Sequence, residues 1–498
     1  MRKGTTLWGR TFGLNTNTPE IGELALLTSV SRRIAVAAVA AAVVASLASI
    51  SSVPADATEK GTEGAGAKAV AHYAGAKIIP GNDRGPSPRL HRVGMGAGEP
   101  TIGATNEGNV YFVALPGSSS KVLKSADQGD TWTDISPTLP SGQNIHKVSL
   151  DPYIYVDEAE GVDRIFTIDL TVACSYMSFS DDEGETWLTN PLACGRPVND
   201  HQTLFSGPPK SSITIDYPNV LYYCWNDVAS SSCSKSIDGG LTFRPTGFPA
   251  YPGVNSEGGF CGGLHGHGHV DVHGNVYLPR EYCGKPYVAI SRDEGTTWEN
   301  ILVAPKAGEG SDPSVTTDRK GNIYYTYIGV DRLPYLVISK DAGKSWTKPM
   351  MIGAPGVKEA NLPSIDASSG TPGKIAIAYY GSDNSPYQRC KPDCEDKMWD
   401  KTTWDGHMTI SVNALDKDPI FYSTTVNAKS DPFKRKHCGP GRCDTNVYDF
   451  IDVQIAPDGQ VWGAFVDGCI LTCPTPDGLQ DSGNDGVVGH LFGFPPLL

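Results

Sequence analysis

Short apolar or alternating segments recur along the chain, and each is followed by the same kind of polar turn. Tyr287–Ile290 and Tyr335–Ile338 are two such segments. The turn is an octapeptide of the pattern S-x-D-x-G-x-T/S-W/F, whose five copies begin at Ser125, Ser180, Ser236, Ser291 and Ser339. The intervals between these serines are 55, 56, 55 and 48 residues. A period of this size indicates a repeat architecture in which each copy is one supersecondary unit.

The composition of the octapeptide predicts a β-hairpin. Its aspartate carboxylate accepts hydrogen bonds from backbone N–H groups just ahead of it, and the glycine two residues later takes the positive φ that a tight turn needs. The closing tryptophan or phenylalanine starts the return strand, with its ring in the core. Each copy is therefore expected to form a hairpin with a buried aromatic anchor.

A second repeat, out of phase with the first, has the pattern of a strand, a turn and a second strand. Glu99–Phe112 and Asp312–Tyr325 are its clearest copies. Further copies begin near Asp151, Asp200, His265, Pro363 and Asp449, which makes seven. The last unit lacks one strand, and a strand from about residues 70–95 would supply it and leave no exposed sheet edge. The sequence therefore predicts an all-β, seven-bladed β-propeller of four-stranded antiparallel blades.

The octapeptide resembles the Asp-box, or BNR repeat, of the sialidase-like β-propellers, and the resemblance covers nearly all of residues 95–495. In that family the box is a structural fastener on an outer hairpin away from the active site, which implies no catalytic role for the five aspartates. Sialidases have six blades, so six is the alternative blade number. A sialidase also carries an arginine motif in its first blade, where this chain has Glu99. This departure argues against exo-sialidase activity itself.

Composition and charge narrow the functional classes. The 498 residues include 56 glycines and 37 prolines, and only 19% are charged, which fits a turn-rich β protein. The formal net charge is −14 and no basic patch is visible, so binding to nucleic acid is not expected. We expect a monomer.

The start of the chain has the pattern of an export signal. A basic segment ending at Arg33 precedes an apolar run and a small-residue cleavage site at Ala57. This order predicts a leader and secretory signal peptide over residues 1–57, and hence a secreted protein with no membrane span in the mature chain. An uncleaved membrane anchor is the alternative. Residues 58–85 are expected to form a flexible lead-in, and residues 86–498 the propeller.

All twelve cysteines follow the predicted signal, which fits export to an oxidising compartment. They fall into six local pairs, each expected to be a disulfide within one blade: Cys174/Cys194, Cys224/Cys233, Cys261/Cys283, Cys390/Cys394, Cys438/Cys443 and Cys469/Cys473. Metal binding by the close pairs is the alternative, but their spacing and the exported context favour disulfides.

Polar residues recur where each inner strand begins, which in a propeller is a point that faces the central axis. They are Glu99, Asp151, Asp200, His265, Asp312, Asn361 or its neighbour, and Asp449 or its neighbour. The catalytic candidates among them are Glu99, Asp151, Asp200, Asp312 and His265. Such a ring would supply paired carboxylates for acid–base chemistry on a glycan, or oxygen ligands for a divalent cation such as calcium. The structural alternative is that an acidic residue before proline caps a turn at each strand entry.

Three histidines stand at alternate positions in one glycine-rich stretch: His265, His267 and His269. Alternate side chains on a strand share one face, so three imidazoles that project together would suit a transition metal such as zinc. The intervening glycines leave room for an open coordination position. The alternatives are that one of the histidines is a general base or binds substrate, or that some bond to a neighbouring blade.

Arg280, Glu281 and Tyr282 lie side by side at the end of the next strand. In sialidases, arginines hold the substrate carboxylate and a tyrosine assisted by a glutamate is the nucleophile. The resemblance therefore implies that Arg280 and Tyr282 bind substrate. Neighbouring residues on a strand point to opposite faces, so the three side chains cannot all meet one substrate.

Two functional classes remain. The first is a secreted carbohydrate-active enzyme, a glycoside hydrolase or polysaccharide lyase, that acts on a glycan or polysaccharide at the central ring. The second is a non-catalytic propeller that binds a glycan or a protein outside the cell. A deep axial pocket with converging titratable groups favours the enzyme, and a channel plugged by apolar side chains favours the binding protein.

Overall fold

The computed structural model describes most of the predicted propeller. The described residues are 77–80, 86–138, 149–159, 162–171, 174–194, 199–227, 230–255, 258–305, 312–385, 402–435, 438–439, 442–443, 449–468 and 484–498. The predicted leader and signal peptide, most of the predicted lead-in, Cys390 with Cys394, and Cys469 with Cys473 lie outside these residues. The regular elements in the described part are all strands, so it holds no helix that is long and apolar enough to cross a membrane.

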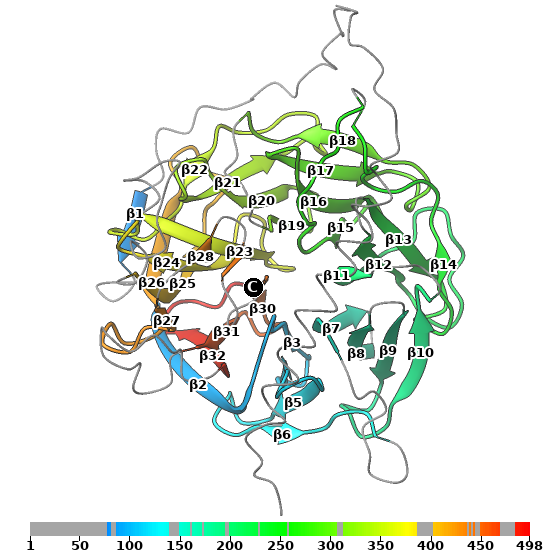
Figure 1. Ribbon diagram of the computed structural model, residues 1–498, viewed down its shortest axis with the longest axis horizontal. Helices are drawn as coiled ribbons and strands as arrows, with labels where there is room; N and C mark the ends of the chain where they lie inside the picture. Colours follow the sequence, from blue (N-terminus) through cyan, green and yellow to red (C-terminus); the bar gives the residue numbers. More distant parts are fainter. Residues whose placement is uncertain are drawn as a thin grey trace, which may run out of the picture. The chain divides into compact units, whose positions relative to one another are not determined.

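Seven of the described sheets surround a common centre, and each runs outward from an inner strand (Figure 1). The prediction of seven blades is confirmed, and the alternative of six is wrong. Blade 1 contains β3 (Ile102–Ala104), β4 (Val110–Ala114), β5 (Lys121–Ser125) and β6 (Thr133–Asp134). Blade 2 contains β7 (Pro152–Ala159), β8 (Val162–Thr171), β9 (Cys174–Ser180) and β10 (Leu188–Leu192). Blade 3 contains β11 (Asp200–Gly207), β12 (Val220–Asn226), β13 (Ser231–Ser236) and β14 (Arg244–Pro245).

The remaining blades continue round the ring in chain order. Blade 4 contains β15 (His269–Val270), β16 (Val276–Tyr282), β17 (Lys285–Ser291) and β18 (Glu299–Leu302). Blade 5 contains β19 (Ser314–Thr317), β20 (Ile323–Ile328), β21 (Pro334–Ser339) and β22 (Met350–Met351). Blade 6 contains β23 (Glu359–Ala367), β24 (Ile375–Ser382), β25 (Thr403–Ser411) and β26 (Ile420–Thr425), and β27 (Lys434–Arg435) pairs with β25.

The last blade is completed by the N-terminal part of the propeller, as predicted. Its strands are β30 (Asp452–Ile455), β31 (Val461–Asp467), β32 (Asp485–Phe492) and β2 (Ser87–Gly96). Strand β2 pairs antiparallel with β32 along most of its length, from Ser87 opposite Phe492 to Arg92 opposite Val487. The two ends of the described propeller are thereby joined by main-chain hydrogen bonds, which closes the ring.

One further strand precedes β2. Strand β1 (Lys77–Pro80) pairs in parallel with β26, at the outer edge of blade 6. This strand lies inside the segment predicted as a flexible lead-in, so the β-structure begins before residue 86, where the sequence places the propeller's start. The repeat pattern of the sequence does not predict β1, because this short edge strand shares no pattern with the rest of the chain.

Apolar side chains of neighbouring blades form the core. Between blades 4 and 5, for example, Tyr277 and Ile290 pack with Ile323. Because both faces of a blade are covered by its neighbours, five of the second strands are buried at every position: β4, β12, β20, β24 and β31. Continuous burial of this kind fixes the inner strands rigidly around the axis.

The five octapeptides form the predicted hairpin turns. In the first, Ser125 Oγ donates to Asp127 Oδ1 at 2.9 Å, and Gly129 N donates to Ser125 Oγ at 2.8 Å. Thr131 donates to the same carboxylate from its backbone N (2.8 Å) and its hydroxyl (2.6 Å). These hydrogen bonds lower the pKa of Asp127. Gly129 has a φ of 87°, which only glycine adopts without strain. The aspartates are thus fully engaged in the turn.

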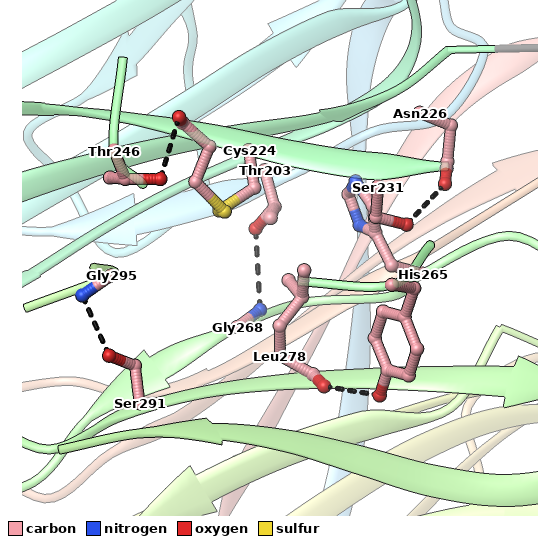
Figure 2. The surroundings of a disulfide bond; sticks show 12 residues. Thr203, Cys224, Asn226, Ser231, Thr246, His265, Gly268, Leu278, Ser291 and Gly295 are labelled. Carbon is pink, nitrogen blue, oxygen red and sulfur yellow. Dashed lines mark hydrogen bonds between the residues drawn. A yellow bond between two sulfur atoms is a disulfide. The ribbon is translucent and has the colours of Figure 1, made fainter. Parts of the chain in front are cut away.

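Three of the predicted disulfides are present in the described residues: Cys174–Cys194, Cys224–Cys233 and Cys261–Cys283. Cys224 and Cys233 lie directly opposite each other on β12 and β13, and Figure 2 shows their surroundings. In the short hairpin of β28 (Cys438–Gly439) and β29 (Arg442–Cys443), Cys438 is paired with Cys443 in the backbone register, but their side chains lie outside the described part.

A buried carboxylate fastens blade 4 to blade 3. Glu294, within the fourth octapeptide, is only 1% exposed and accepts hydrogen bonds from the backbone N of Lys210, Ser211 and Ser212 at 2.7, 2.8 and 3.0 Å. Lys235 Nζ donates to it at 2.9 Å. Burial alone would raise the pKa of Glu294, but these hydrogen bonds outweigh it and hold the pKa well below its usual range. The carboxylate therefore links two blades as an ion.

We predict that Glu294→Gln lowers the free energy of unfolding by about 2–3 kcal/mol, because an amide cannot replace a charged acceptor for several buried donors. Urea denaturation at neutral pH measures the change. Since the folded pKa is depressed, the difference from wild type is present above pH 4.5 and is lost as pH falls through the folded pKa.

The matched control is Glu299→Gln on β18, where the side chain is exposed. It should change the free energy of unfolding by less than about 0.5 kcal/mol. If Glu294→Gln is as stable as this control, the carboxylate is not a fastener between the blades.

Candidate functional site

The starts of the inner strands meet at one end of the axis, which we call the entry end. Two of them use a left-handed backbone that aims a side chain inward: Glu99 has a φ of 55° and His201 a φ of 48°. Asp151 Oδ2 accepts a hydrogen bond from His201 N at 3.0 Å, which joins blades 2 and 3. Asp200, which the sequence predicts at this position of blade 3, lies close enough for its charge to raise the pKa of Glu99, and a register shift follows it in β11, where His201 bonds to Asp151.

The acidic residues predicted at the entry end do converge. Glu99 is 3% exposed, and burial, followed by the charges of Asp151 and Asp449, raises its pKa well above the usual range. Asp449 N also donates to Glu99 Oε1 at 3.3 Å. Asp312 Oδ2 lies 3.5 Å from His201 Nε2. These carboxyl groups are brought together as expected, but they are buried in contacts with one another.

An apolar ring that the sequence reading missed fills the space beside them. The ring centroid of Phe450 lies 5.0 Å from that of His201, 5.5 Å from that of His267 and 6.2 Å from that of Tyr153. When the turns of blades 5 and 7 are aligned, Phe450 matches Asp312, so an alignment by turns would have found it. The entry end is therefore packed with side chains.

The three histidines predicted as metal ligands make three different contacts. His265 is fully buried and its Nδ1 lies 3.1 Å from Gly266 O. His267 Nδ1 lies 3.3 Å from Asp452 Oδ1, and His269 Nδ1 lies 3.1 Å from Thr317 Oγ1. In the described part of the chain, no group of three or more His, Cys, Asp or Glu residues could hold a metal ion. Burial lowers the pKa of His269 to about 4, so its ring is neutral at physiological pH.

Arg280 and Tyr282 are held inside the protein. The Arg280 guanidinium donates to Gly263 O from Nη2 at 2.7 Å and to Ser231 Oγ from Nη1 at 3.0 Å. It also lies 5.5 Å from the ring centroid of Tyr282, whose hydroxyl donates to Pro252 O at 2.8 Å. Ser231 in turn donates to Asn226 Oδ1 at 2.8 Å (Figure 2). These polar groups are used by contacts within blades 3 and 4.

A cavity of about 310 Å³ lies along the axis, next to the packed entry end. Residues from the inner strands of all seven blades line it, from Ile102 of β3 to Ile455 of β30. His267 and Tyr153 face both regions, because they contact Phe450 and also line the cavity. The cavity is thus the open part of the axis, and it is the candidate functional site.

Four carboxyl groups line this cavity: Asp157, Glu158, Asp366 and Asp452. The sequence reading missed all four as site residues, since they lie within the inner strands rather than at their starts. The sequence feature that could have predicted them is an acidic residue inside an otherwise apolar inner strand, as in β7 and β23.

Two of these carboxyl groups have strongly perturbed protonation. Burial, followed by the charge of Asp366, raises the pKa of Glu158 to about 8. Burial likewise raises the pKa of Asp366 to about 7, although Ile455 N and Ala367 N each donate to it at 2.8 Å. Glu158 makes no side-chain hydrogen bond within the described residues. Perturbed acids in a cavity are a common feature of functional sites.

The other two carboxyl groups are fixed by hydrogen bonds. Asp452 accepts from Val453 N at 2.9 Å, Ile102 N at 3.2 Å and Ser364 Oγ at 3.3 Å, so it ties three blades together. Asp157 accepts from Tyr217 Oη at 2.7 Å, and burial raises its pKa. A free acid beside fixed carboxyl groups can donate or accept a proton from a bound molecule.

The chain matches no protein-family model, and no curated protein is similar to it in sequence. Among solved structures, a protein of unknown function from Dyadobacter fermentans is 13% identical over 83% of this chain and 99% of its own, with a TM-score of 0.40. The Aleuria aurantia lectin is 12% identical over 62% of this chain and 91% of its own, with a TM-score of 0.40. The NanB sialidase of Streptococcus pneumoniae is 13% identical over 80% of this chain and 69% of its own, with a TM-score of 0.39. Likenesses of this size carry no argument about ligand or activity.

The two perturbed acids predict a pH dependence of stability with a definite sign. Because both pKa values are raised on folding, the folded protein binds more protons than the unfolded chain, and its stability falls as pH rises. This contribution is present below the ordinary values of 4.5 for Glu158 and 3.8 for Asp366, and it is lost as pH rises through about 8 and about 7.

Denaturation of wild type and of the double variant Glu158→Gln/Asp366→Asn across pH 5 to 9 measures this effect. The free energy of unfolding of the double variant, relative to wild type, should increase steadily with pH. The exposed Glu299→Gln should run parallel to wild type. A double variant that also runs parallel to wild type would show that the two acids titrate normally.

Proposed function

We propose that this sialidase-like, seven-bladed β-propeller binds a glycan in its axial cavity and hydrolyses a glycosidic bond there. The observation that carries the proposal is a free carboxyl group, Glu158, with a pKa of about 8, beside a second carboxyl group, Asp366, with a pKa of about 7. Glycoside hydrolysis needs such a pair, in which one group is protonated and its neighbour is ionised. The volume of about 310 Å³ suits a small ligand.

The two carboxyl groups take different roles. Glu158 is the general acid, because its higher pKa keeps it protonated at neutral pH and no hydrogen bond within the described residues holds its proton. It donates this proton to the glycosidic oxygen as the bond to the anomeric carbon breaks. Asp366 is the general base, held by two backbone N–H groups, and takes a proton from the water that attacks that carbon.

Polar side chains around the acid pair suit a sugar. The Tyr155 hydroxyl lies 3.0 Å from Ser206 Oγ, and Asn219 Nδ2 lies 3.4 Å from the same oxygen. All three residues line the cavity, together with the ring of Tyr153. Aromatic faces and hydroxyl or amide groups are the contacts that orient a polar ligand in a concave site.

The three disulfides support a site of action outside the cytosol, where disulfides persist. This agrees with the export signal expected over residues 1–57.

A non-catalytic glycan-binding propeller is the second candidate. The packed entry end favours it, because Phe450 occupies the axis where the predicted catalytic ring would need open space. In this case the acid pair would serve only to bind the ligand.

The test is a hydrolysis screen against oligosaccharides of differing sugar and linkage, with released reducing ends as the readout. Activity should follow a bell-shaped pH profile that rises as Asp366 ionises near pH 7 and falls as Glu158 loses its proton near pH 8. Glu158→Gln should lower kcat by about 10²–10⁴-fold and leave the binding of a neutral glycan in place. The exposed Glu299→Gln is the control and should match wild type.

Two other outcomes decide against hydrolysis. Binding without cleavage by any substrate would establish the second candidate. Cleavage that is insensitive to Glu158→Gln would move the catalytic site away from the cavity.

A further inference from the structure

The charge of the cavity restricts which sugar it can take. Among the described residues that line it, four are carboxylic acids and none is lysine or arginine. The charges that act most strongly on Glu158 are those of other carboxyl groups, Asp366, Asp163 and Asp157. A cavity with this lining has a negative potential wherever its acids ionise. The charge of Arg164 acts on Asp157, one of the four, but Arg164 does not line the cavity.

The two buried side-chain atoms of the cavity that have no hydrogen bond within the described residues are acceptors. Gln454 Oε1 and His267 Nε2 are buried and make no hydrogen bond within the described residues. In the neutral imidazole, a donor at Nδ1 facing Asp452 leaves Nε2 as an acceptor. Buried polar atoms without a partner mark a place where a ligand or water completes the hydrogen bonding. A ligand that completes it here must bring donors.

A protonated primary amine meets both requirements, since it carries one positive charge and three N–H donors and accepts no hydrogen bond. The rings of Tyr153 and Tyr155 line the same cavity, and aromatic faces attract a cation. A sugar carboxylate has the opposite properties: it brings negative charge and acceptors into a site that already has both.

From this complementarity we infer that the axial cavity selects a sugar residue that carries a free, protonated amine, such as an unacetylated hexosamine, over its N-acetylated, neutral and acidic counterparts. The inference rests on the proposed function, because it takes the ligand of the cavity to be a glycan. Glu158 and Asp366 are the residues that determine this specificity. The selectivity is opposite to that of a site that holds an acidic sugar through arginines.

Matched small glycosides test the inference without the need for turnover. The probes are the methyl β-glycosides of an aminosugar, its N-acetyl derivative, the plain hexose and the uronic acid, each in the gluco and galacto configurations. Saturation-transfer NMR with the full chain at pH 7 gives the binding constants. We expect the aminosugar to bind at least about tenfold more tightly than its N-acetyl and neutral partners, as a charge-assisted contact would give. The uronic acid should not bind measurably.

Variants tie the preference to the cavity. Glu158→Gln and Asp366→Asn should each reduce the preference for the amine by about tenfold, with little change for the neutral glycoside. Glu299→Gln should keep the wild-type preference. Raising the salt concentration should weaken the preference less than it weakens an exposed ion pair, because the cavity is partly screened from solvent.

The binding experiment distinguishes a failure of the inference about charge from a failure of the proposed function. If neutral or N-acetylated sugars bind as tightly as the amine, or the uronic acid binds best, the inference about charge is wrong and the glycan proposal stands. If no glycoside of any charge binds, the proposed function fails and the inference fails with it. If the amine is preferred but both cavity variants keep the preference, the amine binds elsewhere and the inference is wrong.

Discussion

Closure of the ring is the constraint on which the rest of this structure depends. Once β2 pairs with β32, seven inner strands are fixed around one axis, and side chains at equivalent positions of different blades must share a narrow space. Residues about 50 positions apart, such as Asp151 and His201, then become direct partners. Because polar residues recur at the strand starts, closure concentrates titratable groups at the centre of the molecule, where water is scarce.

The protein accommodates this concentration in two ways along the axis. At the entry end, burial raises the pKa of Glu99, which accepts a hydrogen bond from Asp449 N, and Phe450 packs against His201. Farther along, the acids Glu158 and Asp366 face a cavity and are not covered. The first arrangement is a core of hydrogen-bonded acids, whereas the second leaves acidic groups available to a bound molecule. The open space on this axis therefore lies in the cavity, although the sequence pattern points to the entry end.

The sequence determines the fold more readily than the site for a physical reason. The octapeptide forms a local turn in which Asp127 accepts a hydrogen bond from Thr131, four residues away. A short stretch of sequence is therefore enough to predict this turn. The blade number and three disulfides follow from the same short-range order. Which residue faces the axis depends instead on the register shift after Asp200 and on the left-handed backbone of His201. The shape of the cavity depends on the space left by seven distant strands, and no local pattern records it.

The acidity of the cavity also explains why it should bind a ligand at all. Raised pKa values at Glu158 and Asp366 mean that ionising these groups at neutral pH works against the folded state. A cation bound beside Asp366 would favour its ionised form and lower its pKa, while Glu158 keeps the proton that it donates in the proposed hydrolysis. The lack of lysine and arginine among the described lining residues leaves this role to a ligand. A glycan without positive charge would gain only the weaker contacts of the tyrosines and amides, and this difference is the physical basis for the proposed role of charge in specificity.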